Sequence, residues 1–586
     1  MRTWLLPTLL TVAVAALAAR SFFLQIVRGT SFLSVAEGNR VAVLPIPAPR
    51  GIIYDMSGKA LTENIASTDI ILDPSTLPTE ENEAYLIDRL PELLTEITPE
   101  QIRTALTRAR ALQRPVVLKK AVSHAEVLAV ETSLQELYGV RLVSSLVRQY
   151  DYGKDLAHTI GYTGAVTAED LAAEETLLSF DITGKNGLEK FYEGTLRGRA
   201  GAEYVEVNVA GRPQKNLGRQ DPVPGSDLHL TLDAELQHII MELFYEMATA
   251  SGREQPPVSA GAVVALDPRD GAVRALVSFP SFDPNIFSQP SRSRETTVLT
   301  QAPGEPLFAR AVDGSYPPGS TIKPFLGAAA LQEGIITDET TVLSAGGIQV
   351  GIWDFPDWKT GGHGVTDIKK AIAESVNTFF YLVTGGDETH DGLGVERATA
   401  YLGKFGWGEP AEIDVPASGR GFLPSKIWKE KTKGERWYIG DTYHLGIGQG
   451  DVLVTPLQLA ASTAALANGT HLVTPHLNTK VAGDNKPLPV DGQTAAVIRE
   501  AMRQTVTDGS GRRLASFPLA LAGKTGTAQA GGEATTHAWF TSFGPYEGPE
   551  LVITVLLENG GEGDDAAVPF AEKIWQWWYE NRYRTQ

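Results

Sequence analysis

A serine and a lysine that could act as a catalytic pair, Ser320 and Lys323, close the stretch Tyr-Pro-Pro-Gly-Ser-Thr-Ile-Lys. The glycine and the prolines predict a tight loop leading into a helix, on which positions i and i+3 share a face. A serine hydroxyl becomes nucleophilic when a base removes its proton, and a lysine amine can be that base if its pKa is lowered. A serine helix cap beside an unrelated lysine has the same pattern, so the interpretation depends on further motifs.

Two such motifs follow in the chain. Ser375-Val-Asn comes after the helical-looking residues 367–374, and Lys524-Thr-Gly-Thr lies within the strand-like residues 519–529. The S-x-x-K acyl-transfer enzymes carry three motifs of these kinds in this order. Together the motifs predict an enzyme that forms an acyl-serine intermediate.

With these motifs the chain resembles the penicillin-binding proteins and the serine β-lactamases. The octet ending at Lys323 narrows the resemblance to class B penicillin-binding proteins, and among them to the elongation-type transpeptidases of the penicillin-binding protein 2 group. Residues 434–442 and 445–450 are similar to that group as well, although no catalytic role is assigned to them. The resemblance implies a multidomain α/β (α+β) fold. It comprises an N-terminal transmembrane helix, an elongated membrane-proximal α+β pedestal domain and a C-terminal penicillin-binding transpeptidase domain, in which helices flank an antiparallel sheet.

Composition excludes several other classes of protein. The chain has 586 residues, 42% of them hydrophobic, which is enough for several domains with large cores. A net charge of −19 argues against a nucleic-acid partner, since neutralising phosphates needs a basic surface. The absence of cysteine excludes disulfides, cysteine zinc sites and thiol catalysis.

The first residues predict a membrane anchor. Residues 4–19 carry no charge, and residues 22–27 extend the apolar stretch beyond Arg20. A cleaved signal peptide is the alternative, with small residues at 16–18 as its cleavage site. We favour an uncleaved anchor over residues 1–27, because about 20 apolar residues can cross the hydrocarbon layer. Because basic residues favour the cytoplasmic side and Arg2 precedes the span, the rest of the chain would lie outside the cytoplasm. We therefore expect a single-pass inner-membrane protein with a periplasmic catalytic domain.

The sequence divides the remainder into two domains. Residues 28–225 are expected to form the pedestal, which resembles a dimerisation domain and carries a helical head insertion at about 80–144 with helices at 99–111 and 123–138. A strand-turn-strand unit is predicted over residues 39–64 and a solvated hairpin over 197–219. His158 stands alone and is expected to be structural.

Residues 226–586 are expected to form the transpeptidase domain. The predicted elements are a helix at 235–248 capped by Asp233, two strands on either side of the turn at 267–271, two further strands after Lys524 and a terminal helix. The strands are predicted at 261–266, 272–278, 536–543 and 551–558, and the terminal helix at 571–582.

Acidic residues and a histidine crowd the segment before Ser375. Asp357 and His363 are weak candidates for metal ligands, with Asp354 and Asp367 nearby. Oxygen and imidazole groups can bind zinc, and some members of the resembled group have a metal-binding cluster here. A polar loop with a helix cap is the favoured interpretation, because the spacings match no strict metal motif.

The three motifs suggest a role for each residue. Ser320 would attack a carbonyl, Lys323 would act as its base, and Ser375 could relay a proton to the leaving amine. Asn377 could bind the substrate amide and hold Lys323, while Lys524 would help to lower the pKa of that lysine. The third motif, Lys524, Thr525, Gly526 and Thr527, would bind the terminal carboxylate of the substrate, with the glycine letting an extended peptide approach the strand.

The resemblance also implies a reaction and partners. It implies an oxyanion hole made by the N–H groups of Ser320 and Thr527, a D-Ala-D-Ala stem peptide as substrate, and acylation by β-lactams. No cofactor would be required, zinc being an open possibility. The implied partners are a RodA-type membrane glycosyltransferase and an MreC-type scaffold. A D,D-carboxypeptidase or β-lactamase remains an alternative, as does a β-lactam sensor that acylates without turnover.

Overall fold

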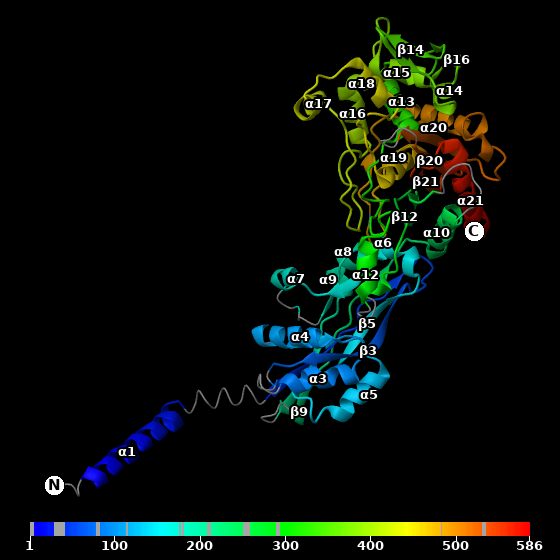
Figure 1. The fold of residues 1–586 in the computed structure, drawn as a ribbon. Coiled ribbons are helices and arrows are strands. Elements are labelled where there is room, and N and C mark those ends of the chain that lie inside the picture. Colours follow the sequence, from blue (N-terminus) through cyan, green and yellow to red (C-terminus); the bar gives the residue numbers. More distant parts are fainter. Residues whose placement is uncertain are drawn as a thin grey trace.

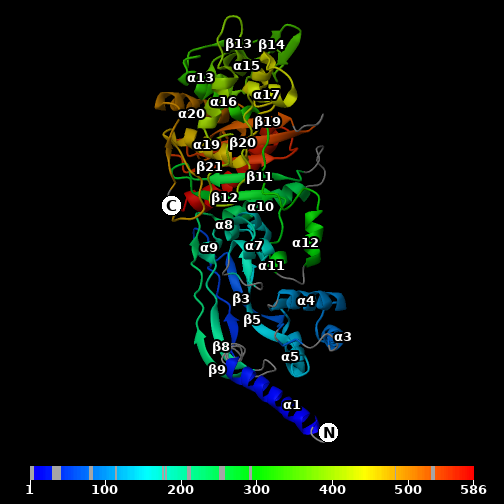
Figure 2. The same ribbon diagram turned by 90° about the vertical axis from the view of Figure 1, so that its left-hand side faces the viewer.

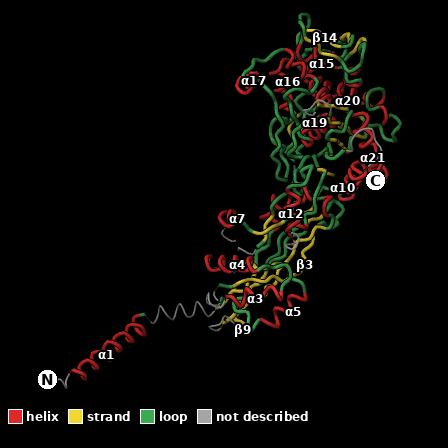
Figure 3. Tube along the Cα trace, viewed as in Figure 1, coloured by secondary structure: helices red, strands yellow, loops and turns green. Residues whose placement is uncertain are grey.

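The structure is a computed structural model, and its described parts form a pedestal and a C-terminal domain, the one expected from the sequence to be a transpeptidase domain, stacked along one long axis (Figures 1 and 3). It describes residues 5–28, 41–74, 76–77, 83–112, 115–174, 177, 181–207, 213–249, 258–288, 293–481, 483–529 and 535–585. This two-domain arrangement of helices and antiparallel sheets confirms the predicted fold class.

The N-terminal helix α1 (Leu5–Phe22) continues as one π-helical turn, Phe23–Val27. Its side chains are exposed and mostly apolar. Within the described residues, Pro7–Val27 is the one helix long and apolar enough to cross a membrane. This agrees with the predicted anchor in length and composition.

Two three-stranded antiparallel sheets form most of the described pedestal. One joins β1 (Val41–Ile46), β8 (Gly201–Val207) and β9 (Pro213–Gln220), which confirms the predicted hairpin. In the other, β3 (Thr62–Leu72) pairs along its whole length with β5 (Val140–Tyr150), and β4 (Val116–Lys119) lies on its other edge. Short elements complete the pedestal: β2 (Ile53–Tyr54), α6 (Ala157–Ile160), β6 (Thr163–Ala165), α7 (Ala168–Ala173), β7 (Ile182–Gly184), α8 (Gly187–Phe191) and α9 (Glu193–Leu196).

The head insertion contains helices and a strand. Helices α3 (Glu83–Leu93), α4 (Pro99–Leu112) and α5 (His124–Ser133) share a core with β3. The predicted helices are present, and β4, which was not predicted from the sequence, returns to the sheet between α4 and α5. Helix α5 begins at a Ser123–Glu126 capping box and ends at Ser133, short of the predicted end at 138, and turns then lead through Gly139 (φ +82°) into β5.

The transpeptidase sheet has five antiparallel strands in the order β12 (Val273–Phe279), β11 (Gly261–Leu266), β21 (Leu551–Leu557), β20 (Thr536–Gly544) and β19 (Ala522–Gln529). Figure 2 shows β12 nearest the pedestal and β19 nearest a helical region at the far end. The third sequence motif therefore lies on an edge strand.

Helices cover both faces of this sheet. Helices α10 (Ala234–Thr249) and α21 (Val568–Trp578) share one core with it, in which Phe244 and Trp575 are fully buried. Helices α19 (Pro456–Asn468) and α20 (Gly492–Thr507) belong to the core on the other face. The predicted strands, the Asp233 cap and the terminal helix are thus confirmed.

The region beyond β19 carries the first two motifs. It contains α13 (Lys323–Gln332), α14 (Ile368–Ala373), α15 (Asn377–Gly385), α16 (Gly394–Lys404), α17 (Lys426–Lys433) and α18 (Ile439–Gly446). Two hairpins lie beside them, β13 (Val342–Ser344) with β16 (Gly364–Thr366), and β14 (Gly347–Val350) with β15 (Trp353–Pro356). The remaining elements are short: α11 (Asn285–Ser288), α12 (Ser293–Thr300), β10 (Leu228–His229), β17 (His471–Leu472) and β18 (Lys486–Pro487).

Polar contacts join the pedestal to the transpeptidase domain. The Tyr192 hydroxyl donates to Asp414 at 2.8 Å, and the buried ring of His158 contacts the Pro306 carbonyl through Nε2 at 2.9 Å. Burial lowers the pKa of His158 to about 4. The predicted structural role of His158 is confirmed.

Candidate active site

The loop before α13 places Ser320 against the edge strand. Gly319–Ile322 forms a 3₁₀ turn, and the α-helix starts at Lys323. Gly319 has φ +53°, and a Cβ there would lie 2.5 Å from the Thr527 carbonyl oxygen. Only glycine therefore allows the serine turn to approach β19 so closely.

Lys323 is fully buried and is held by the second motif. Its Nζ donates to the Ser375 carbonyl at 2.7 Å and to Asn377 Oδ1 at 2.8 Å, and it lies 3.3 Å from Ser375 Oγ. A neutral amine has two hydrogens, and the two shorter contacts can take both. Its lone pair is then available to accept a proton from a hydroxyl.

Ser320 is not a hydrogen-bond partner of that amine among the described residues. Ser320 lies in the 3₁₀ turn and Lys323 is the first residue of α13, three positions later, as the sequence predicts. The amine of Lys323 itself is anchored by Ser375 and Asn377. Catalytic hydrogen bonds are often loose before substrate binds. The geometry is therefore compatible with Lys323 as the base.

Ser375 occupies an unusual backbone conformation. Its φ is +57°, although it is not a glycine, and it connects the end of α14 to the start of α15. Such a conformation costs about 1–3 kcal/mol and persists only where surrounding contacts impose it. Here it accompanies a Ser375 carbonyl that contacts the Lys323 amine.

The electrostatic surroundings favour a neutral Lys323. Burial lowers the pKa of its amine well below the usual range, the positive charge of Lys524 lowers it further, and Asp357 opposes the shift. Burial likewise lowers the pKa of Lys524 to about 7, against the opposing effect of Asp564. Lys524 therefore lowers the pKa of Lys323, as predicted, although burial lowers that pKa more.

The third motif lies on β19 with its hydroxyls already engaged. The Thr525 hydroxyl contacts Ser510 Oγ at 2.6 Å, and the Thr527 hydroxyl donates to Glu562 at 2.7 Å. A Cβ on Gly526 would lie 2.9 Å from the Pro318 carbonyl oxygen. The structure gives this glycine a further reason, because it leaves room for the serine loop of the protein itself. Its predicted role in letting a substrate strand approach stays a prediction.

Two residues of the segment 445–450 complete the site, although sequence reasoning gave them no role. The Gly448 carbonyl accepts from Gly319 N–H at 3.0 Å, and Gln449 Nε2 donates to the Thr527 carbonyl at 3.4 Å. The N–H and C=O of one strand residue point to the same side. The Thr527 N–H therefore points away from β20 and toward the serine loop, as an oxyanion hole requires.

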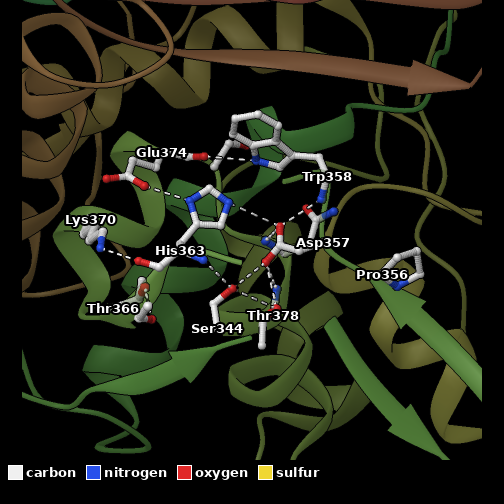
Figure 4. A network of polar contacts seen from close by, with 12 residues as sticks. Ser344, Pro356, Asp357, Trp358, His363, Thr366, Lys370, Glu374 and Thr378 are labelled. Atoms are coloured by element: carbon white, nitrogen blue, oxygen red, sulfur yellow. Dashed lines mark hydrogen bonds and ion pairs between the residues drawn. The ribbon is translucent and has the colours of Figure 1, made fainter. Parts of the chain in front are cut away.

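Asp357 and His363 are brought together as the sequence suggested, but they do not fit zinc. His363 Nε2 is buried without a hydrogen-bond partner in the described part of the chain, 3.6 Å from Asp357 Oδ1 (Figure 4). Zinc needs at least three protein ligands. Among the described residues, no group of three or more His, Cys, Asp or Glu side chains is placed to hold a metal ion. Asp367 instead caps α14, and Asp354 is exposed on β15.

Comparison with family models matches both domains. Residues 261–576 match the penicillin-binding protein transpeptidase domain, and residues 45–230 match the penicillin-binding protein dimerisation domain. The chain belongs to the penicillin-binding proteins. The domain boundaries at 27 and 225 stay predictions.

Relatives place the chain in the penicillin-binding protein 2 group. It is 34% identical to the peptidoglycan D,D-transpeptidase MrdA of Haemophilus influenzae over 95% of this chain and 88% of the relative. Its structure is similar to penicillin-binding protein 2 of Helicobacter pylori, solved in complex with MreC (TM-score 0.81, 27% identity, covering 93% of this chain and all of that one). It is also similar to a chain of a peptidoglycan synthase complex (TM-score 0.73, 30% identity, 99% of each chain). This penicillin-binding protein is a serine-type D,D-transpeptidase of peptidoglycan synthesis.

Proposed function

We propose that the chain crosslinks peptidoglycan stem peptides during cell-wall elongation through an acyl-enzyme on Ser320. The observation that carries the proposal is the buried Lys323 amine, anchored by Ser375 and Asn377 one helical turn from Ser320. A lysine held in this way can be neutral near physiological pH and act as a base.

The first half-reaction forms the ester. The Ser320 Oγ attacks the carbonyl carbon between the two terminal D-alanines while its proton passes to Lys323. The Ser320 and Thr527 N–H groups stabilise the oxyanion. The amide C–N bond then breaks, and the proton passes from Lys323 through Ser375 to the leaving D-alanine amine. Protonated Lys524 would hold the terminal carboxylate.

The second half-reaction makes the crosslink. The amine of a neighbouring stem peptide attacks the ester carbonyl, loses its proton to Lys323, and forms a new amide as the Ser320 oxygen leaves and regains a proton. No step needs a metal or an organic cofactor.

The N-terminal helix and the relatives support the proposed location and partners of the protein. We place α1 in the inner membrane as a single span, with the catalytic domain in the periplasm. The relatives solved with MreC and in a synthase complex support an MreC-type scaffold and a RodA-type polymerase as partners. β-Lactams would acylate Ser320 in place of the peptide.

Labelling of the full-length protein in detergent with a fluorescent penicillin tests the proposal. We expect one stable adduct, located by mass spectrometry on the peptide containing Ser320 and absent from Ser320→Ala. Rapid hydrolysis of the adduct would instead indicate a β-lactamase. Peptide crosslinking in the presence of a membrane polymerase then separates a transpeptidase from a carboxypeptidase or a sensor.

A further inference from the structure

The turn that carries Ser375 lacks a cap of its own. Helix α15 starts at Asn377, and its N-cap residue, Val376, has no side chain that can accept a hydrogen bond. The first N–H groups of a helix have no partner within the helix. These groups lie next to the strained Ser375 and to the two atoms that anchor Lys323.

Asp357 supplies the missing cap from another segment. Its Oδ1 accepts from the Asn377 N–H at 3.0 Å, and its Oδ2 accepts from the Thr378 N–H at 3.1 Å and the Thr378 hydroxyl at 2.7 Å. Oδ2 also accepts from Ser344 Oγ at 3.1 Å. The carboxylate is buried, so the Asn377 and Thr378 N–H groups would be left without their partner if it were removed.

The other side of the turn is tied to the same segment. His363 Nδ1 lies 2.7 Å from a carboxylate oxygen of Glu374, and Trp358 Nε1 donates to the Glu374 carbonyl at 3.2 Å. His363 also donates through its backbone N–H to Ser344 Oγ at 3.2 Å. Figure 4 shows the His363 ring between Asp357 and Glu374, so the residues immediately before and after the Ser375 turn are both held.

We propose that Asp357 and His363 are positioning residues of the transpeptidase reaction. They hold the turn from Glu374 to Asn377 in the strained shape that presents the Ser375 carbonyl and Asn377 Oδ1 to Lys323. This inference rests on the proposed function and goes beyond it, because neither residue belongs to the three motifs.

Asp357 also acts on the base through its charge. The charged groups that influence Lys323 are Lys524 on β19 and Asp357 in the loop after β15. Removing the negative charge of Asp357 leaves Lys524 as the charged neighbour, so Lys323 would lose its proton at lower pH. The acid limb of the acylation profile would then move to lower pH.

The test measures the rate and the amplitude of acylation separately. Full-length Asp357→Asn is compared with wild type and with Asp491→Asn, which alters the carboxylate that caps α20 away from the site. We expect Asp357→Asn to label to full amplitude with a first-order acylation constant lowered between about tenfold and 100-fold. We expect the acid limb to move to lower pH and Asp491→Asn to match wild type.

The rate and the amplitude of labelling distinguish a positioning role of Asp357 from a role in folding alone. Loss of folded protein lowers the amplitude at an unchanged rate, and that result would overturn the proposal, as would a wild-type rate in Asp357→Asn. If Asp357→Asn does not accumulate, Thr378→Val removes one donor to the carboxylate and is assessed by the same criteria. Absence of any labelling in the wild type would reject the proposed function itself.

Discussion

The pedestal and the catalytic domain each contain a pair of buried basic side chains that influence their surroundings in different ways, Arg50 and Arg148 in the pedestal and Lys323 and Lys524 in the catalytic domain. In the pedestal, Arg148 donates to Glu189 Oε1 at 2.8 Å, and Arg50 contacts Glu189 Oε2 and Glu193. Burial alone would raise the pKa of Glu189, but the two guanidinium groups outweigh it and lower that pKa. These charges are therefore kept by pairing.

In the catalytic domain the buried pair is two lysines. Among the described residues, neither Lys323 nor Lys524 has a carboxylate within ion-pair distance, and both have lowered pKa values. Desolvation without a counter-charge disfavours the charged form of an amine. A buried cation with a carboxylate beside it keeps its charge and belongs to a structural cluster. A buried amine without such a carboxylate loses its proton more readily and can act as a base.

The largest expected effect is loss of the base. Lys323→Met should lower the acylation rate by about 10²–10⁴-fold, the usual contribution of a general base. The melting temperature should not fall, because the change removes a buried amine that lacks a counter-charge. Fluorescent-penicillin kinetics and thermal melting measure the two effects, with Lys573→Met on the exposed face of α21 as the control. A near-normal rate would exclude Lys323 as the base.

In the pedestal, removing a buried charge should lower stability. Glu189→Gln leaves two buried guanidinium groups without their shared carboxylate, and we expect it to lower the free energy of unfolding of the pedestal by about 3–5 kcal/mol. Hydrogen exchange in β3 and β5 measures this locally. Glu92→Gln, at an exposed pair with Arg89, is the matched control and should change little. Unchanged protection in β3 and β5 would contradict the role of the buried cluster.

The pH dependence sharpens the comparison. Lys524, with a pKa of about 7, must be protonated to bind a carboxylate, so the second-order acylation constant should fall about tenfold per pH unit well above pH 7. It should also fall at low pH, where Lys323 becomes protonated. Acylation rates from pH 5 to 9 test this. A β-lactam ester without the carboxylate should lack the basic limb, and a basic limb shared by the ester would contradict the assignment.

Loss of a hydrogen bond between two uncharged groups should have the smallest effect on the acylation rate. Gln449→Ala removes one long hydrogen bond to the Thr527 carbonyl, and we expect acylation to slow about fivefold, as the loss of ~1 kcal/mol would produce. The acylation rate constant measures the effect, with Gln493→Ala at an exposed position of α20 as control. A change of several hundredfold would mean that Gln449 acts directly on the reacting groups.

Local signals in the sequence accounted for much of the fold. The turn signal at 267–271 located β11 and β12 on either side of it, and Asp233 marked the start of α10. The helix predicted at 123–138 was too long, because turns connect Ser133 to β5. The close approach of Gly526 to the serine loop could not be predicted, since its neighbour Pro318 lies about 200 positions away in the sequence and on a different element.

The sequence by itself determined which residues could react and which family they belong to. Residue type and order are local properties, and they were sufficient to identify Ser320, Lys323 and the two later motifs. Only the tertiary structure decided that Lys323 is anchored by Ser375 and Asn377, that Asp357 caps α15 and that Gln449 reaches Thr527. Protonation, capping and strain depend on burial and on partners distant in the chain, and these are set when the β19 edge and the helices beyond it pack together.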